Sequence, residues 1–274
     1  MTTAPTATTA GEELPFESRP KLPRMVRHSL VTLAYLAVII GAWAAYVHLG
    51  GVPIFLLPPP EAVGGALWDL VKTGQLWPNL LYTSQNILIG FVSGIVIGIL
   101  LGYLLWASRW AREISAPYVV ILQAAPKIAI APLLVLWFGL GATSQLALIL
   151  MLTFFPMMIA MSLGLSSISS DVKALGEILA MSRWRYFTTV QLPGAMPDLF
   201  SGAKIAMIDA MTGAFLAEYI SAQKGLGYLM VLGNTSYNTP LLIASVILTI
   251  AVGLLGFGLV SLAERRVLRW RSAR

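Results

Sequence analysis

The sequence predicts an all-α, polytopic membrane protein with about six transmembrane helices. Apolar residues make up 57% of its 274 residues and charged residues only 11%, and the mean hydropathy is +0.79. A water-soluble domain needs far less apolar surface to fill one core. The net charge of +6 is spread between the apolar segments, so it does not form the basic face of a nucleic-acid-binding protein. Because the chain contains no Cys, disulfides and thiolate chemistry are excluded.

Six segments are long and apolar enough to cross a bilayer, which takes about 20 residues of helix. They are residues 29–49, 83–106, 118–138, 144–164, 199–220 and 241–263. The uncharged stretch from Lys127 to Asp171 is too long for one span. Turn-forming residues divide it into a tight hairpin of the third and fourth spans: Gly139, Gly141, Thr143 and Ser144.

The distribution of Lys and Arg predicts the orientation. Lys72 and Lys224 fall on one side of this scheme and Lys127 and Lys204 fall inside spans, whereas 14 of the 18 basic residues fall on the other side. Basic residues near the ends of spans stay in the cytoplasm, so both termini are expected there. The 14 residues are Arg19, Lys21, Arg24, Arg27, Arg109, Arg112, Lys173, Arg183, Arg185, Arg265, Arg266, Arg269, Arg271 and Arg274.

The domain organisation follows from these spans. Residues 1–28 are polar and rich in Thr, Ala and Pro, which predicts a disordered cytoplasmic segment. The apolar run after them is too long for a signal peptide and is expected to be a retained span. A single transmembrane domain over residues 29–264 and a basic cytoplasmic tail at residues 265–274 complete the chain.

The longest loop on the cytoplasmic side covers about residues 165–197. Residues 171–193 read DVKALGEILAMSRWRYFTTVQLP, with apolar residues at helical spacing up to Leu179 and a break near Met181 and Ser182. A second short helix is expected from Arg183 toward Val190. From periodicity alone, this loop is either a knob of two short helices or an amphipathic connector lying on the membrane surface.

The loop resembles the cytoplasmic EAA loop of binding-protein-dependent ABC transporter permeases, which reads Glu-Ala-Ala, three residues, Gly, nine residues, a β-branched residue, one more and Leu-Pro. Val190, Leu192 and Pro193 match the end of the pattern. At its start, Ala174, Leu175 and Gly176 stand at the Glu-Ala-Ala positions, and Ala180 stands at the Gly position. The resemblance implies that the loop couples the permease to an ATPase through Asp171, Ala174, Leu175, Gly176, Glu177, Ala180, Met181, Ser182, Arg183 and Arg185.

Further motifs extend the resemblance to the sulfonate, nitrate and taurine branch of these permeases. They are LLPPPEAV (56–63), PKIAIAPLLVLWFG (126–139), AEYISAQKGLGYL (217–229) and AERRVLRW (263–270). The resemblance implies the ABC type I importer permease fold, a second permease copy in what is most simply a homodimer, a cytoplasmic ABC ATPase dimer and an external substrate-binding protein. The implied solute is a small sulfonate-, taurine- or nitrate-like anion or a pyrimidine-type vitamin precursor.

The chain itself is expected not to be an enzyme and to hold no cofactor, because it has no G-x-x-x-x-G-K-[ST] loop to bind phosphates. ATP and Mg would be bound by the partner ATPase. No metal site is expected, since His28 and His48 are isolated in the sequence. The alternative function is a secondary transporter or an intramembrane enzyme that works without an ATPase.

Two sets of residues within the spans are candidates for special roles. Gly90, Gly94, Gly98 and Gly102 repeat every four residues, which predicts close packing of another helix. Of the ionisable residues, Lys204 and Glu218 lie near span ends, where interfacial positions are expected, and Lys127 and Asp209 have similar estimated depths. Three readings of Lys127 stay open, namely an ion pair with Asp209, a position at the inner surface, and contact with the solute.

Overall fold

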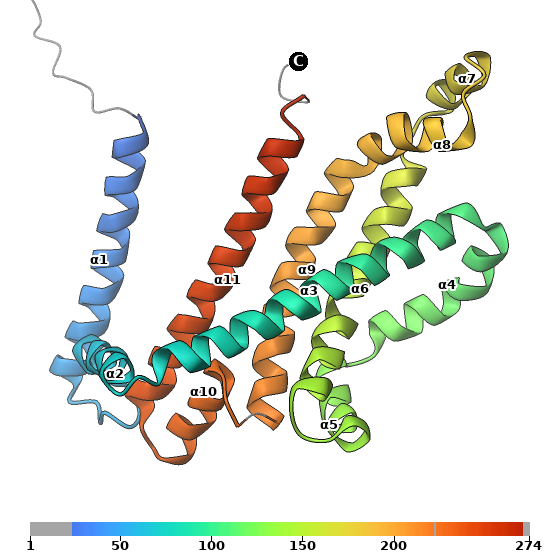
Figure 1. Ribbon diagram of the computed structural model, residues 1–274. Coiled ribbons are helices and arrows are strands. Elements are labelled where there is room, and N and C mark those ends of the chain that lie inside the picture. The colour runs from blue at the N-terminus through green and yellow to red at the C-terminus, as the bar shows by residue number, and fades with distance from the viewer. Residues whose placement is uncertain (1–23, 222, 271–274) are drawn as a thin grey trace, which may run out of the picture. The chain divides into compact units, whose positions relative to one another are not determined.

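A computed structural model describes residues 24–221 and 223–270, and every regular element within them is helical (Figure 1). The chain divides after Gly51 into two compact units. The first contributes α1 (Arg24–Gly50), whose residues from Val31 onward form a candidate membrane span. Of the segment predicted to be disordered, residues 1–23 lie outside the described residues and residues 24–28 belong to α1.

The second unit, from Val52 onward, holds all the other described helices. In order they are α2 (Pro60–Lys72), α3 (Leu76–Ala107), α4 (Arg109–Ala124), α5 (Lys127–Phe138), α6 (Ala142–Ser166), α7 (Ser170–Ile178), α8 (Arg183–Tyr186), the π-helical turn η1 (Phe187–Gln191), α9 (Leu192–Ser221), α10 (Leu226–Thr235) and α11 (Thr239–Val267). Helices α3, α6, α9 and α11 are long and apolar enough to cross a membrane. Together with α1 they confirm five of the six predicted spans within the described residues.

The third predicted span, residues 118–138, is wrong as a continuous helix. Its residues are divided between α4 and α5, and the break falls at Ala125 and Pro126. Proline offers no backbone N–H and disfavours helical geometry at the preceding residue, and Ala125 is accordingly extended, with ψ 133°. The predicted hairpin nevertheless forms between α5 and α6, where Gly139 and Gly141 take positive φ values of 80° and 129°.

The core of the second unit is built from α3, α6 and α9, and α11 packs against α9. Small residues on α9 bring it close to α6. Ala206, Ala210 and Ala214 are fully buried, and a side chain at Gly202 or Gly213 would meet atoms of α6. Many large apolar side chains on the outer surfaces are exposed, among them Leu254 and Leu255 of α11. These surfaces are suited to lipid, where the hydrogen bonds within each helix satisfy the backbone.

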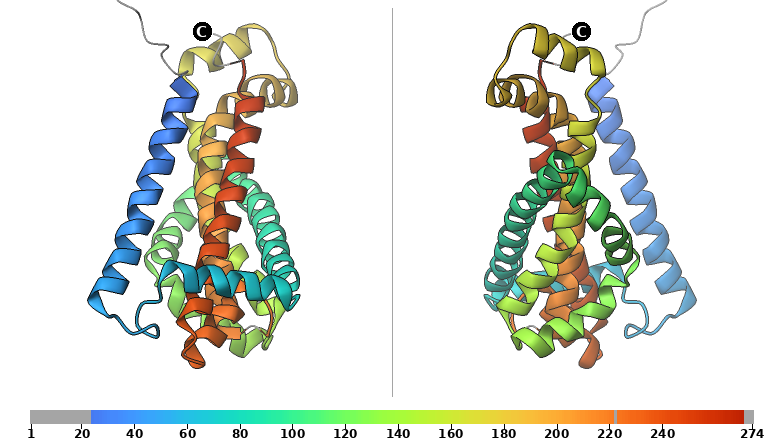
Figure 2. Two further views of the ribbon diagram at one scale, coloured as in Figure 1. Left: turned by 90° about the vertical axis from the view of Figure 1, so that its left-hand side faces the viewer. Right: turned by 90° about the vertical axis from the view of Figure 1, so that its right-hand side faces the viewer.

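The two ends of the second unit differ in structure. Helices α7 and α8 lie at one end, as does the C-terminal end of α11, while α10 and the α5–α6 hairpin lie at the other (Figures 1 and 2). Helix α2 crosses α11 near that second end, and the two helices are in contact (Figure 2). We refer to residues 167–191 as the helical arm, and to the two ends as the arm end and the opposite end.

Candidate functional site: a helical arm and an intramembrane cavity

The helical arm consists of α7, a short turn, α8 and η1. Helix α7 ends in a Schellman motif, in which the N–H of Ala180 donates to the carbonyl of Glu177 (2.9 Å) and the N–H of Met181 donates to that of Gly176 (3.1 Å). This motif requires left-handed backbone at Ala180, whose φ is 46°. The predicted break near Met181 is confirmed, and its cause is this backbone reversal.

A close packing contact fixes the angle between α7 and α8. A Cβ at Gly176 would lie 2.7 Å from two ring atoms of Tyr186, so only glycine lets the ring rest on α7. Ser182 caps α8 by accepting a hydrogen bond from the N–H of Arg185 (3.3 Å). The arm thus contains the two short helices expected for the knob.

The sequence-derived coupling residues gather on the arm. Gly176 is buried, Met181 is half-buried, and the other eight are exposed. Exposed apolar side chains lie beside them on α7, including Leu175 (54% exposed) and Ile178 (79% exposed). An exposed apolar surface of this kind at the end of a membrane domain is typical of a protein docking site.

A cavity of about 500 Å³ opens between α4, α6 and α9. Its wall is largely apolar, and four polar side chains line it: Gln123, Asp198, Ser201 and Asp209. Asp209 is half-buried there. Lys127 is the first residue of α5, a helix that contacts α9, but its side chain lies outside the described part of the structure. Pairing of Lys127 with Asp209 therefore stays a prediction.

Glu218 is buried by protein, which corrects the expectation of a solvated or interfacial charge. It lies on α9 and is only 1% exposed. One carboxyl oxygen accepts hydrogen bonds from the hydroxyl of Thr83 on α3 (2.8 Å) and from the N–H of Gly227 on α10 (2.9 Å). The hydroxyl of Thr83 in turn accepts from the N–H of Leu226 (2.8 Å). This carboxyl group thus joins α3, α9 and α10.

A second set of hydrogen bonds adds α6 to this arrangement. Gln145 of α6 is fully buried, and its side-chain oxygen accepts from Tyr82 and Asn86 of α3, each at 3.0 Å. Its amide donates to the hydroxyl of Ser221 at the end of α9 (3.3 Å). We call the side chains of Tyr82, Thr83, Asn86, Gln145, Glu218 and Ser221 the Glu218 network. It clamps four helices at the opposite end of the molecule.

The Glu218 network was not predicted from the sequence, although Glu218 lies in the AEYISAQKGLGYL motif. The sequence feature that could have indicated it is the pair of glycines after Glu218, Gly225 and Gly227. A Cβ at Gly227 would lie 2.6 Å from the Cβ of Glu218, and Gly225 has a φ of 112°. Both positions therefore need glycine so that the loop can close over the carboxyl group.

Lys204 is engaged by another helix. Its ammonium group lies 2.5 Å from a carboxylate oxygen of Glu264 on α11. The two side chains retain 26% and 22% of their exposure, so the ion pair is partly shielded from solvent. Asp209, on the same helix as Lys204, lines the cavity instead. Lys204 and Asp209 therefore face different surfaces of α9.

The four glycines of α3 lie against α6. A Cβ at Gly90 would come within 2.7 Å of Ile149, and one at Gly98 would lie 2.5 Å from the carbonyl oxygen of Phe154. At Gly102 it would come within 2.7 Å of the Cβ of Met161. The two helices thus approach each other along several turns of α3.

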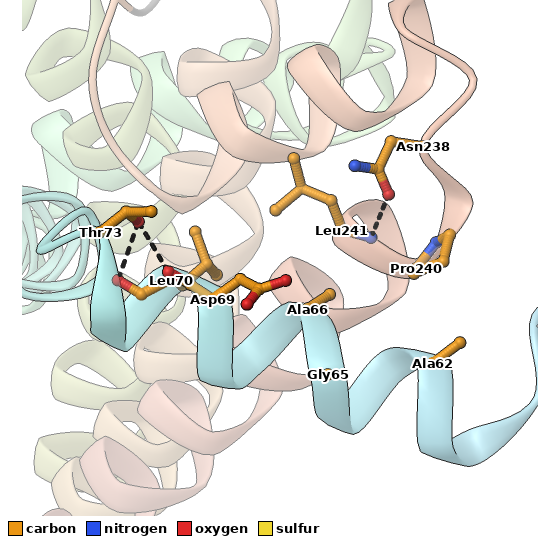
Figure 3. Close-up of a pocket in the computed structure, with 9 residues that line it drawn as sticks. All are labelled: Ala62, Gly65, Ala66, Asp69, Leu70, Thr73, Asn238, Pro240 and Leu241. Atoms are coloured by element: carbon orange, nitrogen blue, oxygen red, sulfur yellow. Dashed lines mark hydrogen bonds between the residues drawn. The ribbon is translucent and has the colours of Figure 1, made fainter.

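A smaller cavity, of about 370 Å³, lies at the opposite end between α2 and the start of α11 (Figure 3). Small residues of α2 form one wall, and Asn238 and Pro240 lie on the other side. The hydroxyl of Thr73 donates to the carbonyl of Asp69 (2.7 Å), and Asn238 caps α11 by accepting from the N–H of Leu241 (3.2 Å). These hydrogen bonds hold the ends of the two helices.

Comparison with known proteins agrees with this architecture. Residues 94–269 match the family of the binding-protein-dependent transport system inner membrane component. The riboflavin transport system permease protein of Chloroflexus aurantiacus is 36% identical over 89% of this chain and 90% of its own length. The putative aliphatic sulfonates transport permease protein of Escherichia coli is 34% identical over 86% of this chain and 89% of its own length. The formylaminopyrimidine transport permease protein of Halalkalibacterium halodurans is 32% identical over 88% of this chain and 95% of its own length.

A solved structure supports the fold independently. A chain of the methionine ABC transporter MetNI, in an inward-facing conformation, superposes with a TM-score of 0.61 at 19% identity, covering 72% of this chain and 97% of that one. This likeness concerns the fold alone, but it extends over nearly the whole of the known chain. Family match, relatives and fold agree, and the chain belongs to the binding-protein-dependent transport system inner membrane components, a family of multi-pass bacterial inner membrane proteins.

Proposed function

We propose that this chain is the permease subunit of an ATP-driven ABC importer and provides the membrane pathway for a small solute. The observation that carries the proposal is the helical arm at one end of the close-packed α3–α6–α9 core, in a chain of this family. An arm whose apolar side chains are exposed needs a partner, and the coupled ATPase of such an importer is that partner. An external substrate-binding protein delivers the solute to the other side.

The permease itself catalyses no reaction in this proposal. ATP and Mg are bound by the cytoplasmic ATPase dimer, and the arm transmits the movement of that dimer into the membrane. The surface that the ATPase contacts is the exposed side of α7, around Leu175 and Ile178, together with Arg185 of α8. Gly176 and Ala180 act indirectly, by shaping the arm.

The solute pathway is proposed to follow the cavity that Asp209 lines, completed by a second copy of the same chain. A half-buried carboxyl group in a largely apolar wall is typical of a transport path, because ionisable groups at membrane depth are costly to retain otherwise. The relatives are described as permeases for riboflavin, aliphatic sulfonates and formylaminopyrimidine. The solute of this chain is therefore expected among small anions and nitrogen-containing vitamin precursors, with the binding protein as the main selector.

The coupling step can be tested in the assembled transporter. We expect Ile178→Pro, which breaks α7, and Arg185→Glu, which reverses a charge on α8, to abolish solute-stimulated ATP hydrolysis in proteoliposomes while membrane insertion stays normal. Lys72→Glu reverses an exposed charge at the opposite end and is the matched control. Normal coupling in both arm variants would place the ATPase contact elsewhere.

The orientation can be tested with single cysteines, since the natural chain has none. A cysteine at Ser170, in the arm, should react with an impermeant thiol reagent only from the cytoplasm. A cysteine at Gln75, at the opposite end, should react only from outside. Labelling in the reverse sense would overturn the orientation derived from the basic residues.

A further inference from the structure

A third cavity, at the arm end, has a different chemistry from the Asp209 cavity. It is a groove of about 500 Å³ between α3, α6 and the arm. Apolar side chains form most of its lining, and Arg183 is the charged residue in it. We call it the Arg183 groove, and its lining residues are Ile99, Leu100, Tyr103, Met161, Arg183, Trp184 and Phe187.

The groove lies where a membrane helix meets the aqueous end. Tyr103 and Ile99 are four and eight residues before the end of α3 at Ala107. At about 1.5 Å per residue, they lie about 6 and 12 Å from that end. Leu100, between them, is 63% exposed. The floor of the groove thus lies at the depth of the upper acyl chains of one leaflet, which a water-soluble protein does not reach.

The mouth of the groove carries a positive charge that the described protein does not neutralise. Arg183 forms no ion pair with a carboxylate of residues 24–221 and 223–270, whereas Arg109 pairs with Glu113 and Lys204 with Glu264. Arg185 adds a second exposed positive charge on the same short helix. A guanidinium above an apolar floor at a membrane surface is complementary to a phosphate joined to acyl chains.

Aromatic side chains connect this groove to the arm. Trp184, 74% exposed, stacks on Phe187 with ring centroids 6.0 Å apart. Phe187 meets Tyr103 of α3 edge to face at 5.5 Å. Trp and Tyr are favoured at the headgroup level of a bilayer, where one side of the ring is apolar and the other is wet. A molecule in the groove would therefore brace α8 and η1 against α3.

We propose that the Arg183 groove binds an anionic phospholipid of the cytoplasmic leaflet, with its phosphate on Arg183 and an acyl chain along Ile99 and Leu100. The lipid holds the arm against α3, so anionic lipid raises the efficiency with which ATP hydrolysis is coupled to the membrane domain. The lining of this site includes neither the exposed side of α7 nor Arg185, where the ATPase contact is proposed, and its lipid-binding part does not depend on the proposed transport function.

The test uses the full transporter in nanodiscs of phosphatidylcholine, with or without phosphatidylglycerol. Native mass spectrometry measures the phosphatidylglycerol retained by each complex. We expect Arg183→Gln to retain about fivefold less than the wild type, since one basic residue at a membrane surface contributes about that factor. Arg266→Gln, which removes an exposed charge at the end of α11 outside the groove, is the matched control, and Arg183→Lys should restore part of the retention. Equal retention by wild type and Arg183→Gln, or an equal loss in Arg266→Gln, would overturn the site.

A second readout separates lipid from the ATPase as the partner of Arg183. Phosphatidylglycerol should stimulate ATP hydrolysis by the wild type and by Arg266→Gln, whereas Arg183→Gln should lose this stimulation and keep its rate in phosphatidylcholine alone. If Arg183→Gln instead lowered the rate equally in both membranes, Arg183 would contact the ATPase and the proposal would be wrong. Lipid retention is measured without any transported solute, so this result is independent of the importer assignment.

Discussion

The two ends of the second unit are held together in different ways. At the opposite end, the Glu218 network joins α3, α6, α9 and α10 through buried directional hydrogen bonds, and Thr83, Gln145 and Glu218 are each no more than 1% exposed. At the arm end, α7 and α8 are largely exposed and are attached by a ring packed on Gly176 and a few aromatic contacts.

This difference shows how one small domain can be both rigid and responsive. Buried hydrogen bonds are costly to break, because each separated group loses its partner away from water. Apolar contacts at a surface can slide or part at much lower cost. Movement applied to the arm is therefore expected to displace α8 and η1 first, while the Glu218 network keeps the other ends of the helices in place.

The largest effect is expected from removing the centre of the network. Glu218→Ala leaves the hydroxyl of Thr83 and the N–H of Gly227 without their acceptor and opens a void, at a cost of about 3 kcal/mol in the free energy of unfolding. Thermal unfolding of the detergent-solubilised protein measures the change. Glu113→Ala is the control, since Glu113 forms an exposed ion pair with Arg109, and such pairs contribute less than about 1 kcal/mol. Equal unfolding temperatures for the two variants would refute the clamp.

The second-largest effect on stability is expected from filling the glycine contacts between α3 and α6. In Gly98→Ala, the new Cβ would lie 2.5 Å from the carbonyl oxygen of Phe154, and a backbone atom cannot rotate away. Overpacking of this kind costs about 1 to 3 kcal/mol. Gly258→Ala is the matched control, because no atom lies within 4 Å of its added Cβ. If both variants unfolded at the same temperature, the close approach of α3 and α6 would not contribute to the free energy of unfolding.

The Lys127–Asp209 pair would connect the Asp209 cavity to the start of α5. If the pair forms, each single neutral substitution leaves the other charge in low dielectric, and the double variant should be milder than the worse single one. A double-mutant cycle on unfolding and on solute uptake should give a coupling energy of about 1 kcal/mol. A coupling energy of zero would leave Asp209 as a residue of the solute pathway alone.

Much of the helical architecture follows from the sequence, because hydropathy reports directly on the lipid solvent. The exception is the third span, whose apolar residues satisfy the length rule although Pro126 divides the helix. The average hydropathy of a segment of about 20 residues does not reveal that one residue, here Pro126, lacks the backbone N–H that a continuous helix needs. The arm could also be anticipated, since helical spacing and the resemblance both indicate a short-helix knob at residues 171–190.

The Glu218 network could not be predicted in the same way. Its partners are far apart in the chain, with 135 residues between Thr83 and Glu218 in sequence number and 76 between Gln145 and Ser221. A carboxyl group near the end of a span can be stabilised either by solvent or by buried hydrogen bonds. The local sequence does not determine which of these two environments it has. Here the choice depends on where α3 and α10 lie relative to α9.

The smallest effect is expected at Ala180, where the resemblance and the backbone agree. The position of the pattern's glycine is the left-handed residue of the Schellman motif that ends α7, and Ala180 occupies it with a φ of 46°. Ala180→Gly removes a backbone penalty of about 1 to 2 kcal/mol but adds freedom to the unfolded chain, which returns about 0.4 to 1 kcal/mol. The net gain of about 0.5 kcal/mol is confined to the turn, so hydrogen exchange of the Met181 N–H should slow about twofold while global unfolding stays unchanged.

Ala180→Val, which adds a β-branched side chain at a positive φ, should act in the opposite direction. Faster exchange in Ala180→Gly would show that the turn is not limited by backbone strain.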